Sequence, residues 1–298
     1  MRETVLVTGA DGFVGRRLTP ALSRSGHIVY THSAADGDIA RCKLDYPGVT
    51  RVIHLAARSF VPESWTDPRG FYEVNVLGAV NVLEFCRARQ AALTYISSYV
   101  YGRPTELPIA EGHRRMAANP YSHTKILAED VCDFYAQAHE VRVCVVRPFN
   151  LYGPDQDEKF LIPLLIRQAA DPNSRTIEVA DDRPKRDFLH VDDFVKLLLA
   201  VCERKAAGVY NAGSGESVSI RQIVDILNQF LASPKALTSR GERRSEEIMD
   251  VVADIRKAKT ELGWKPEISL RDGLAQLMQA AASGRPFPDR DSAESAQE

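Results

Sequence analysis

Short apolar runs alternate with amphipathic stretches through the first half of the chain. The runs predict buried strands at residues 5–7, 27–30, 51–55, 93–96 and 141–146. The stretches between them carry apolar residues at helical spacing and predict helices at 16–23, 71–89 and 121–139. Because strands and helices alternate, the pattern predicts an α/β fold built on a doubly wound parallel sheet.

Two regions depart from this alternation. Residues 33–47 are polar and carry no clear strand pattern, so the region after the second strand is expected to be abbreviated. After Pro148, turn signals separate further elements, and we predict a strand at 176–179 and helices at 160–170, 191–203, 220–231 and 270–282.

These changes suggest a division of the chain. A first domain covers 1–150, with 187–213 returning to it. A small α/β lobe comprises 151–186 and 214–283. Residues 284–298 are rich in Pro, Asp, Ser and Glu and are expected to form a disordered tail.

Composition narrows the function classes. Charged residues make up 26% of the 298 residues and the net charge is −2, so no basic field suggests nucleic-acid binding. No apolar run approaches the ~18 residues of a membrane span, and no signal peptide is expected, so a cytoplasmic location is predicted. The five cysteines form no Cys-x-x-Cys pair and the seven histidines lack ligand spacing, so no metal site is expected.

Three glycines, Gly9, Gly12 and Gly15, follow the first predicted strand, and a helix pattern begins directly after them. Such a turn needs glycine for a tight bend, for close approach of backbone to phosphate, and for packing of helix on strand. A strand–glycine turn–helix unit rests a dinucleotide pyrophosphate on the helix N-terminus. The motif therefore predicts a Rossmann-like dinucleotide-binding domain; a purely structural turn is the alternative.

The residue that ends the second strand distinguishes NAD from NADP, because a carboxylate there binds the ribose hydroxyls and repels a 2′-phosphate. This position falls at about Ser33, which is no carboxylate. Arg16 and Arg17 could meet a phosphate, although a solvated surface role explains them equally well. Asp38 could contact the adenine from the following loop. We expect NAD or NADP as cofactor, with NADP favoured.

Tyr121 and Lys125 lie four residues apart on one face of a predicted helix. A free phenol has a pKa of about 10, and a neighbouring ammonium lowers that pKa, so the phenol can exchange a proton near neutral pH. Ser97 ends a predicted strand at the edge where open sheets bind ligands, and can hydrogen-bond a reacting oxygen. The alternatives without function are that the spacing of Tyr121 and Lys125 arises by chance and that Ser97 is an ordinary serine in a turn at the end of a strand.

An ordered series of motifs runs from Val5 to about Trp264. They are Thr8-Gly9-x-x-Gly12-x-x-Gly15, His54-Leu55-Ala56-Ala57, Asn75-Val76-x-Gly78, Ser97-Ser98-x-Val100-Tyr101-Gly102, Tyr121-x-x-x-Lys125, Arg147-Pro148-Phe149-Asn150-Leu151-Tyr152-Gly153-Pro154, Arg186-Asp187-Phe188-Leu189-His190-Val191-Asp192-Asp193 and Tyr210-Asn211-x-Gly213-Ser214-Gly215. In this series the chain resembles the extended short-chain dehydrogenase/reductase family, in its group of NAD(P)-dependent nucleotide-sugar epimerases, dehydratases and 4-ketoreductases.

The resemblance implies residue roles. Ser97, Tyr121 and Lys125 match the catalytic residues. The cofactor is expected at Gly9, Gly12, Phe13, Val14, Gly15, Ser33, Asp38, Leu55, Ala56, Ala57, Asn75, Tyr121 and Lys125. The nucleotide-diphosphate sugar is expected at Ser98, Asn150, Arg186 and Arg244, with Arg243 as the rival of Arg244. Guanidinium forks and amide donors suit a diphosphate.

Departures from the family pattern narrow the reaction. Family 4,6-dehydratases add an adjacent Asp-Glu pair after the catalytic Ser/Thr, whereas this chain has Ser98 and Tyr99, so dehydration is disfavoured. Reduction of a nucleotide-linked 4-keto-6-deoxyhexose is favoured, and a 4-epimerase that retains NAD is the alternative. A non-catalytic nicotinamide or nucleotide-sugar sensor is the remote alternative. The resemblance also implies a homodimer formed through helices 71–89 and 121–139.

Overall fold

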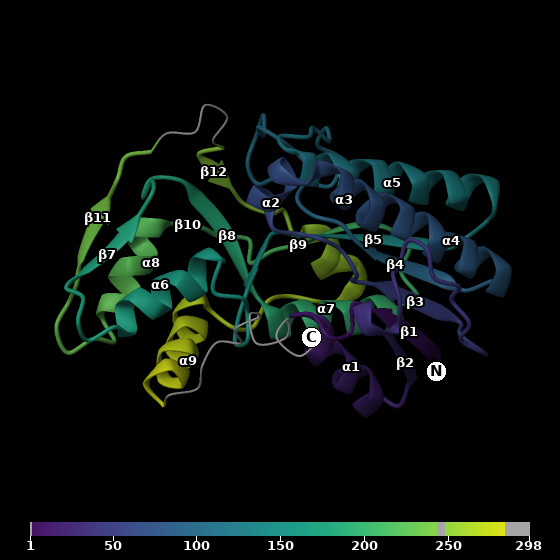
Figure 1. Cartoon of the computed structure of the whole chain (residues 1–298), viewed down its shortest axis with the longest axis horizontal. Helices are drawn as coiled ribbons and strands as arrows, with labels where there is room; N and C mark the ends of the chain where they lie inside the picture. The colour runs from purple at the N-terminus through teal and green to yellow at the C-terminus, as the bar shows by residue number, and fades with distance from the viewer. Residues whose placement is uncertain (1, 243–247, 284–298) are drawn as a thin grey trace, which may run out of the picture.

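A computed structural model describes residues 2–242 and 248–283, so the predicted tail and Arg244 lie outside the described residues. Its larger sheet has six parallel strands in the order β2–β1–β3–β4–β5–β9 (Figure 1). The strands are β1 (Thr4–Thr8), β2 (Ile28–His32), β3 (Arg51–His54), β4 (Ala92–Ile96), β5 (Val143–Pro148) and β9 (Gly208–Ala212). The predicted α/β fold with a doubly wound parallel sheet is confirmed.

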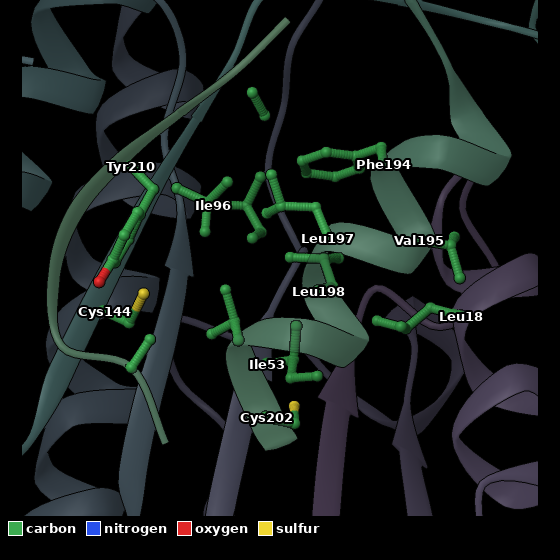
Figure 2. Close-up of a cluster of buried hydrophobic side chains, with 14 of the residues drawn as sticks. Leu18, Ile53, Ile96, Cys144, Phe194, Val195, Leu197, Leu198, Cys202 and Tyr210 are labelled. Carbon is green, nitrogen blue, oxygen red and sulfur yellow. The ribbon is translucent and has the colours of Figure 1, made fainter. Parts of the chain in front are cut away.

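Helices cover both faces of this sheet. The helices α1 (Gly15–Arg24) and α7 (Val191–Glu203) lie on one face, and α4 (Gly78–Arg89) and α5 (Pro120–Ala138) lie on the other (Figure 1). On the α7 face, Leu18, Phe194 and Leu198 are fully buried against Ile53 and Ile96 of the sheet (Figure 2). Burial of such side chains provides the main stabilisation of the layers.

The abbreviated region predicted after the second strand leaves β2 at the edge of the sheet. In the commonest six-stranded dinucleotide-binding order, a further strand lies outside the second one. Here the chain forms only the short 3₁₀ turn η1 (Ala34–Asp36) before it enters β3. The side chain of His32 holds this connection, because its ring contacts the Tyr46 hydroxyl at 2.9 Å and the Gly37 carbonyl at 3.2 Å.

The second half of the chain adds smaller sheets and a separate core. Strand β8 (Lys185–His190) pairs with β6 (Asn150–Tyr152), β10 (Ser217–Ser219) and β12 (Asp250–Val251), while β7 (Thr176–Val179) pairs with β11 (Ala236–Ser239). The helices α6 (Leu161–Ala170), α8 (Ile220–Asn228) and α9 (Leu270–Ala282) bury their apolar faces in a core with β7 and β8. These elements form the left-hand part of Figure 1.

The predicted helix over 71–89 is interrupted. It consists of α3 (Pro68–Tyr72), the π-helical turn η2 (Glu73–Leu77) and α4, and it follows the short helix α2 (Val61–Thr66). A second π turn, η3 (Ala258–Leu262), precedes α9. A π turn inserts one residue into the helical register, and such turns occur frequently at functional sites. The first one carries Asn75, which is buried.

Within residues 2–242 and 248–283, no helix combines the length and the apolar character that a membrane span requires. All five cysteines are free, and Cys86, Cys132, Cys144 and Cys202 are buried.

Candidate active site

The glycine turn lies between the ends of β1 and β3. Gly9 has φ +67°, a conformation that favours glycine, and its N–H donates to the His32 carbonyl at 2.7 Å. A Cβ at Gly9 would lie 2.7 Å from the Ala56 nitrogen, and one at Gly15 would lie 2.6 Å from the Ala10 Cα. At Gly12 the nearest atom would be the Gly9 oxygen at 3.2 Å. The turn is therefore closed by backbone at Gly9 and Gly15 and more open at Gly12.

This geometry fits a dinucleotide. Phe13 and Val14 complete the turn, Val14 occupies the N-cap of α1, and Gly15 is the first residue of that helix. The side chain of Val14 accepts no capping bond from the backbone N–H groups of the first turn. In the first turn of α1 the Arg16 N–H donates to the Gly12 carbonyl at 3.0 Å and the Arg17 N–H donates to the Val14 carbonyl at 3.1 Å. The N-terminus of such a helix attracts a phosphate because the helix dipole favours negative charge there.

The segment after β3 packs against the glycine turn at Gly9. The Leu55 N–H donates to the Thr8 carbonyl at 3.2 Å, and the Ala56 N–H donates to the Thr8 hydroxyl at 3.3 Å. Thr8 also contacts His54 Nδ1 at 2.7 Å. Leu55, Ala56 and Ala57 are half-buried, and the predicted cofactor loop is thus bonded directly to the strand that carries the glycine turn.

Asn75 connects this loop to the catalytic helix. Its Oδ1 accepts from the Arg58 N–H at 2.9 Å, and its Nδ2 donates to the Arg58 carbonyl at 3.0 Å and to the Thr124 hydroxyl at 2.9 Å. Both N–H groups of the amide are therefore used within the protein. In this structure Asn75 holds the loop next to Lys125, and a direct contact of Asn75 with the cofactor stays a prediction.

A carboxylate lies close to the end of β2. Ser33 is followed by the η1 turn, which brings the Asp36 carboxylate back to Ser33, within 2.8 Å of its nitrogen and 2.9 Å of its hydroxyl. These bonds hold the pKa of Asp36 below its ordinary value. Ser33 directly follows β2, and the Asp36 carboxylate, which no prediction named, lies beside it. Its sequence signal is Ser33-x-x-Asp36, a capping box.

Two other polar residues considered for the adenosine end, Asp38 and Arg17, are engaged within the protein, while Arg16 is exposed on α1. Asp38 accepts from the Ala40 N–H at 2.9 Å and lies 3.6 Å from the Arg41 guanidinium. Arg17 lies 3.0 Å from Asp155 and 3.4 Å from Asp192. A role of Arg17 at a 2′-phosphate therefore loses its support, because the guanidinium is already paired.

The predicted catalytic residues converge where β4 ends and α5 begins. Asn119 caps α5 by accepting from the Ser122 N–H at 2.8 Å, which sets the first turn of the helix and with it Tyr121. The Lys125 ammonium is buried, donates to the Ile96 carbonyl at 2.8 Å and lies 4.9 Å from the ring centre of Tyr95. The phenol ring of Tyr121 lies edge-on to Phe71 at 6.4 Å.

The two serines after β4 lie differently. Ser97 is held by its N–H, which donates to the Val146 carbonyl at 2.8 Å, and its hydroxyl is buried with no protein partner. The Ser98 side chain lies close enough to Tyr121 to favour a lower pKa of the phenol. The structure therefore brings Ser98, predicted at the sugar, beside the phenol. An unbonded buried hydroxyl at Ser97 suits a ligand that would supply the missing partner.

Burial sets the proton affinities of the two titrating residues. Loss of contact with water raises the pKa of Tyr121 to about 12, against the opposing effect of the Ser98 side chain. Loss of contact with water also lowers the pKa of Lys125 to about 8, against the opposing charge of Glu129. The phenol is therefore protonated at neutral pH, and the lysine is mainly an ammonium ion. The expected lowering of the phenol pKa by Lys125 is not found, because burial outweighs it.

The predicted sugar-nucleotide residues lie at the junction with the second half of the chain. The Asn150 amide donates to the Asp187 carbonyl at 3.0 Å, and its oxygen lies 3.5 Å from the Tyr99 hydroxyl. Arg186 donates to the carbonyls of Lys185 at 2.8 Å and Ile248 at 2.7 Å. Arg244, the other predicted diphosphate ligand, lies outside the described residues.

Two residues at this junction were not predicted as functional. Asp187 is fully buried, and its carboxylate accepts from the Ser214 N–H and hydroxyl at 2.6 and 2.7 Å, and from the N–H groups of Gly215 and Ala253 at 3.0 Å. Burial raises the pKa of this carboxyl despite these bonds. Tyr99 stacks on Phe149 at 5.2 Å. In the sequence, Asp187 and Tyr99 fall within the family motifs, but nothing in those motifs indicated a role for either side chain.

Comparison with known proteins agrees with this geometry. The family model described as GDP-mannose 4,6 dehydratase matches residues 44–277. The chain is 32% identical to the GDP-6-deoxy-D-mannose reductase of Pseudomonas aeruginosa, over 93% of this chain and 97% of that protein. It is 29% identical to the UDP-glucose 4-epimerase of Corynebacterium glutamicum, over 88% and 91%.

Among solved structures, RMD from Pseudomonas aeruginosa complexed with NADPH superposes with a TM-score of 0.87 at 31% identity, and the match covers 95% of this chain and 99% of that chain. The match of the family model covers well over half of the chain, and it includes the predicted catalytic residues. The chain therefore belongs to the GDP-mannose 4,6 dehydratase family, within the extended short-chain dehydrogenase/reductase enzymes that act on nucleotide sugars.

Proposed function

We propose that this enzyme reduces the 4-keto group of a nucleotide-linked 4-keto-6-deoxyhexose. The observation that carries the proposal is the position of the protonated Tyr121 phenol. Tyr121 lies on α5, one helical turn before Lys125, and the Lys125 ammonium donates to the Ile96 carbonyl at the end of β4. The same turn of α5 is bonded through Thr124 and Asn75 to the loop after β3. A bound nicotinamide would supply the hydride for this reduction.

Each catalytic residue has a distinct task. Tyr121 donates its proton to the C4 oxygen, and burial favours the protonated phenol that this direction of reaction requires. Ser98 orients the phenol, and the unbonded hydroxyl of Ser97 hydrogen-bonds the same C4 oxygen. The Lys125 ammonium stabilises the phenolate left after proton transfer and binds the cofactor ribose.

The substrate's diphosphate is assigned to Asn150, Arg186 and Arg244, as the family resemblance implies. The first two residues lie together, because Asn150 donates to the carbonyl of Asp187 and Arg186 precedes it on β8. Guanidinium and amide groups supply the donors that a diphosphate needs.

Dehydration is not part of the proposal. The two residues after Ser97 are Ser98 and Tyr99, and neither carries a carboxyl group that could remove a proton from the sugar. Tyr99 is an aromatic wall stacked on Phe149, with its hydroxyl near Asn150.

NADPH is the cofactor in this proposal. Its support is the NADPH complex of the Pseudomonas aeruginosa structure. Asp36 is the residue that would oppose a 2′-phosphate, but Ser33 engages its carboxylate through two hydrogen bonds. A direct comparison of NADPH with NADH decides between the two.

A homodimer is also proposed. Leu77 and Phe134, on the two helical segments that the resemblance assigns to a dimer contact, expose 52% and 59% of their surface. A second copy of the chain would cover them, and light scattering of the purified protein measures its mass in solution.

The deciding experiment follows nicotinamide absorbance while the purified protein meets NADPH or NADH and a panel of 4-keto-6-deoxy nucleotide sugars. Oxidation of the cofactor, matched mole for mole by reduced sugar, is expected. If no cofactor is consumed, C4 isomers form and nicotinamide is released only on denaturation, the protein is a 4-epimerase. The similarity to the Corynebacterium glutamicum enzyme supports this alternative. Ligand binding without any turnover would establish a sensor.

A further inference from the structure

The face of α5 that carries Tyr121 and Lys125 continues to a third ionisable residue. Glu129 follows Lys125 by four residues, so the three side chains occupy successive turns of one helical face. Glu129 is only 2% exposed. The proposed reaction assigns it no task, although a carboxylate is rarely buried this deeply without a partner.

Glu129 is held by a guanidinium fork. The Arg147 Nε donates to one carboxylate oxygen at 2.9 Å, and its Nη2 donates to the other at 2.5 Å. Arg147 is itself only 4% exposed and comes from the end of β5, the strand next to β4. A bidentate pair of this kind fixes both position and orientation, because two parallel hydrogen bonds leave little freedom of rotation.

The same guanidinium also reaches the loop that carries the catalytic serines. The Arg147 Nη1 donates to the Tyr101 hydroxyl at 3.0 Å and to the Glu111 carbonyl at 3.1 Å. The Tyr101 hydroxyl donates in turn to the Asn211 oxygen at 2.5 Å. Tyr101 follows Ser97 by four residues, so Arg147 is bonded both to the serine loop and to the catalytic helix.

We propose that Glu129 is a positioning residue of the reaction, which through Arg147 and Tyr101 holds the Tyr121–Lys125 turn of α5 at a set distance from Ser97 and Ser98. This inference rests on the catalytic roles proposed above for Tyr121, Lys125 and Ser97. Glu129 does not touch the reacting atoms, and its effect passes through the residues that do.

Its charge has a second consequence for Lys125. The groups that face this ammonium from the surrounding elements are His54 of β3, Tyr95 of β4, and Glu129 and Cys132 of α5. Glu129 favours the charged form of Lys125, against the burial that lowers the pKa of Lys125 to about 8. Arg115, which donates to Glu129 at 3.0 Å from a half-buried position, partly neutralises the carboxylate.

Three variants separate positioning from simple stability. Glu129→Gln keeps the shape and removes the charge. We expect kcat to fall about tenfold and the pKa of Lys125 to fall by about one unit. Arg115→Gln leaves the carboxylate less neutralised, so the pKa of Lys125 is expected to rise. Tyr101→Phe removes the link to the serine loop without a change of charge, so kcat falls while the pKa of Lys125 stays the same.

The pKa of Lys125 is read from protein labelled with [¹³C]lysine, with the signal assigned from the spectrum of Lys125→Arg. This titration needs no sugar substrate, so a wild type that reduces no 4-keto sugar would refute the proposed function and leave the lysine measurement intact. In an active enzyme the alkaline limb of the kcat/KM profile should move in the same direction as the lysine pKa.

Unchanged kcat and an unchanged Lys125 titration in Glu129→Gln would overturn the inference. Shifts of the Lys125 pKa in the same direction in Glu129→Gln and Arg115→Gln would also overturn it. Thermal melting reports whether each variant folds. If Glu129→Gln does not fold, the inference is tested by the other two variants: the Lys125 pKa must rise in Arg115→Gln and kcat must fall in Tyr101→Phe.

Discussion

The proposed cofactor side and the proposed substrate side of this site are held together by different means. Tyr121 and Lys125 occupy neighbouring turns of one helix, and the glycine turn is one continuous segment from Gly9 to Gly15. The substrate side depends on Asp187, whose carboxylate joins residues 27 and 66 positions away in the chain.

This difference separates chemistry from stability. A side chain on the catalytic helix can lose its reactive group while the backbone that carries it stays in place. At the junction, the group that shapes the substrate site is also the group that connects the segments. Changes on the cofactor side should therefore alter turnover, and changes at the junction should alter stability and substrate affinity together.

The largest effect is expected at Tyr121. Tyr121→Phe removes the proton donor and leaves the ring packed near Phe71, so turnover should fall at least ~100-fold with cofactor affinity little changed. Steady-state kinetics and NADPH fluorescence titration measure the two quantities. Turnover near that of the wild type would show that Tyr121 is not the proton donor.

At the junction, Asp187→Asn should lower the free energy of unfolding by about 3 kcal/mol, because an amide cannot accept all four bonds made by the buried carboxylate. The KM for the sugar nucleotide should rise more than kcat falls. Urea unfolding and steady-state kinetics measure these effects. Asp192→Asn, a half-exposed residue of the same motif, is the matched control, and equal losses in the two variants would contradict the special role of Asp187.

A smaller effect is expected from pH on the cofactor side. His54 is buried, and loss of contact with water lowers the pKa of its ring to about 3, below the ordinary value of 6.5. As pH falls below 6.5, His54 binds a proton in the unfolded chain but not in the folded protein, so the free energy of unfolding decreases. Between pH 7 and 5.5 the loss from this group is about 1.2 kcal/mol.

His54→Asn, which keeps an acceptor for Thr8, should abolish this part of the pH dependence in urea unfolding at the two pH values. The exposed His139→Asn should leave it unchanged. A pH dependence in His54→Asn equal to that of the wild type would show that His54 titrates normally in the folded protein.

The smallest effect is expected where the two sides meet at the surface. Arg17 of α1 pairs with Asp155 and Asp192 of the second half of the chain, and both carboxylates are more than half exposed. Arg17→Gln should therefore cost no more than ~1 kcal/mol. The ratio of the KM values for NADPH and NADH should stay the same, because the guanidinium is engaged by carboxylates. A selective loss of NADPH affinity would instead return Arg17 to the 2′-phosphate.

Local patterns predicted much of the fold. Three elements have the predicted bounds: the helices at 191–203 and 270–282 and the strand at 176–179. In each of them the apolar residues follow one periodicity, helical or strand-like, from end to end. The helix over 71–89 was predicted without its π turn, since an inserted residue leaves the apolar spacing almost unchanged. The predicted helix over 220–231 ends at Asn228, and turns follow it.

The sequence by itself determined the motifs whose function lies within one segment: the glycine turn, the Tyr121–Lys125 face and the lack of carboxylates at Ser98 and Tyr99. These depend on the φ of one residue, on helical periodicity or on residue identity, all of which are local. Only the tertiary structure decided that Asn75 joins the Arg58 backbone to Thr124, that Asp36 folds back on Ser33, that the Ser98 side chain lies beside the phenol and that Arg147 joins Glu129 to Tyr101. Each of these contacts depends on the direction of a side chain after distant strands have paired, and a hydrogen bond exists only when both partners have been placed.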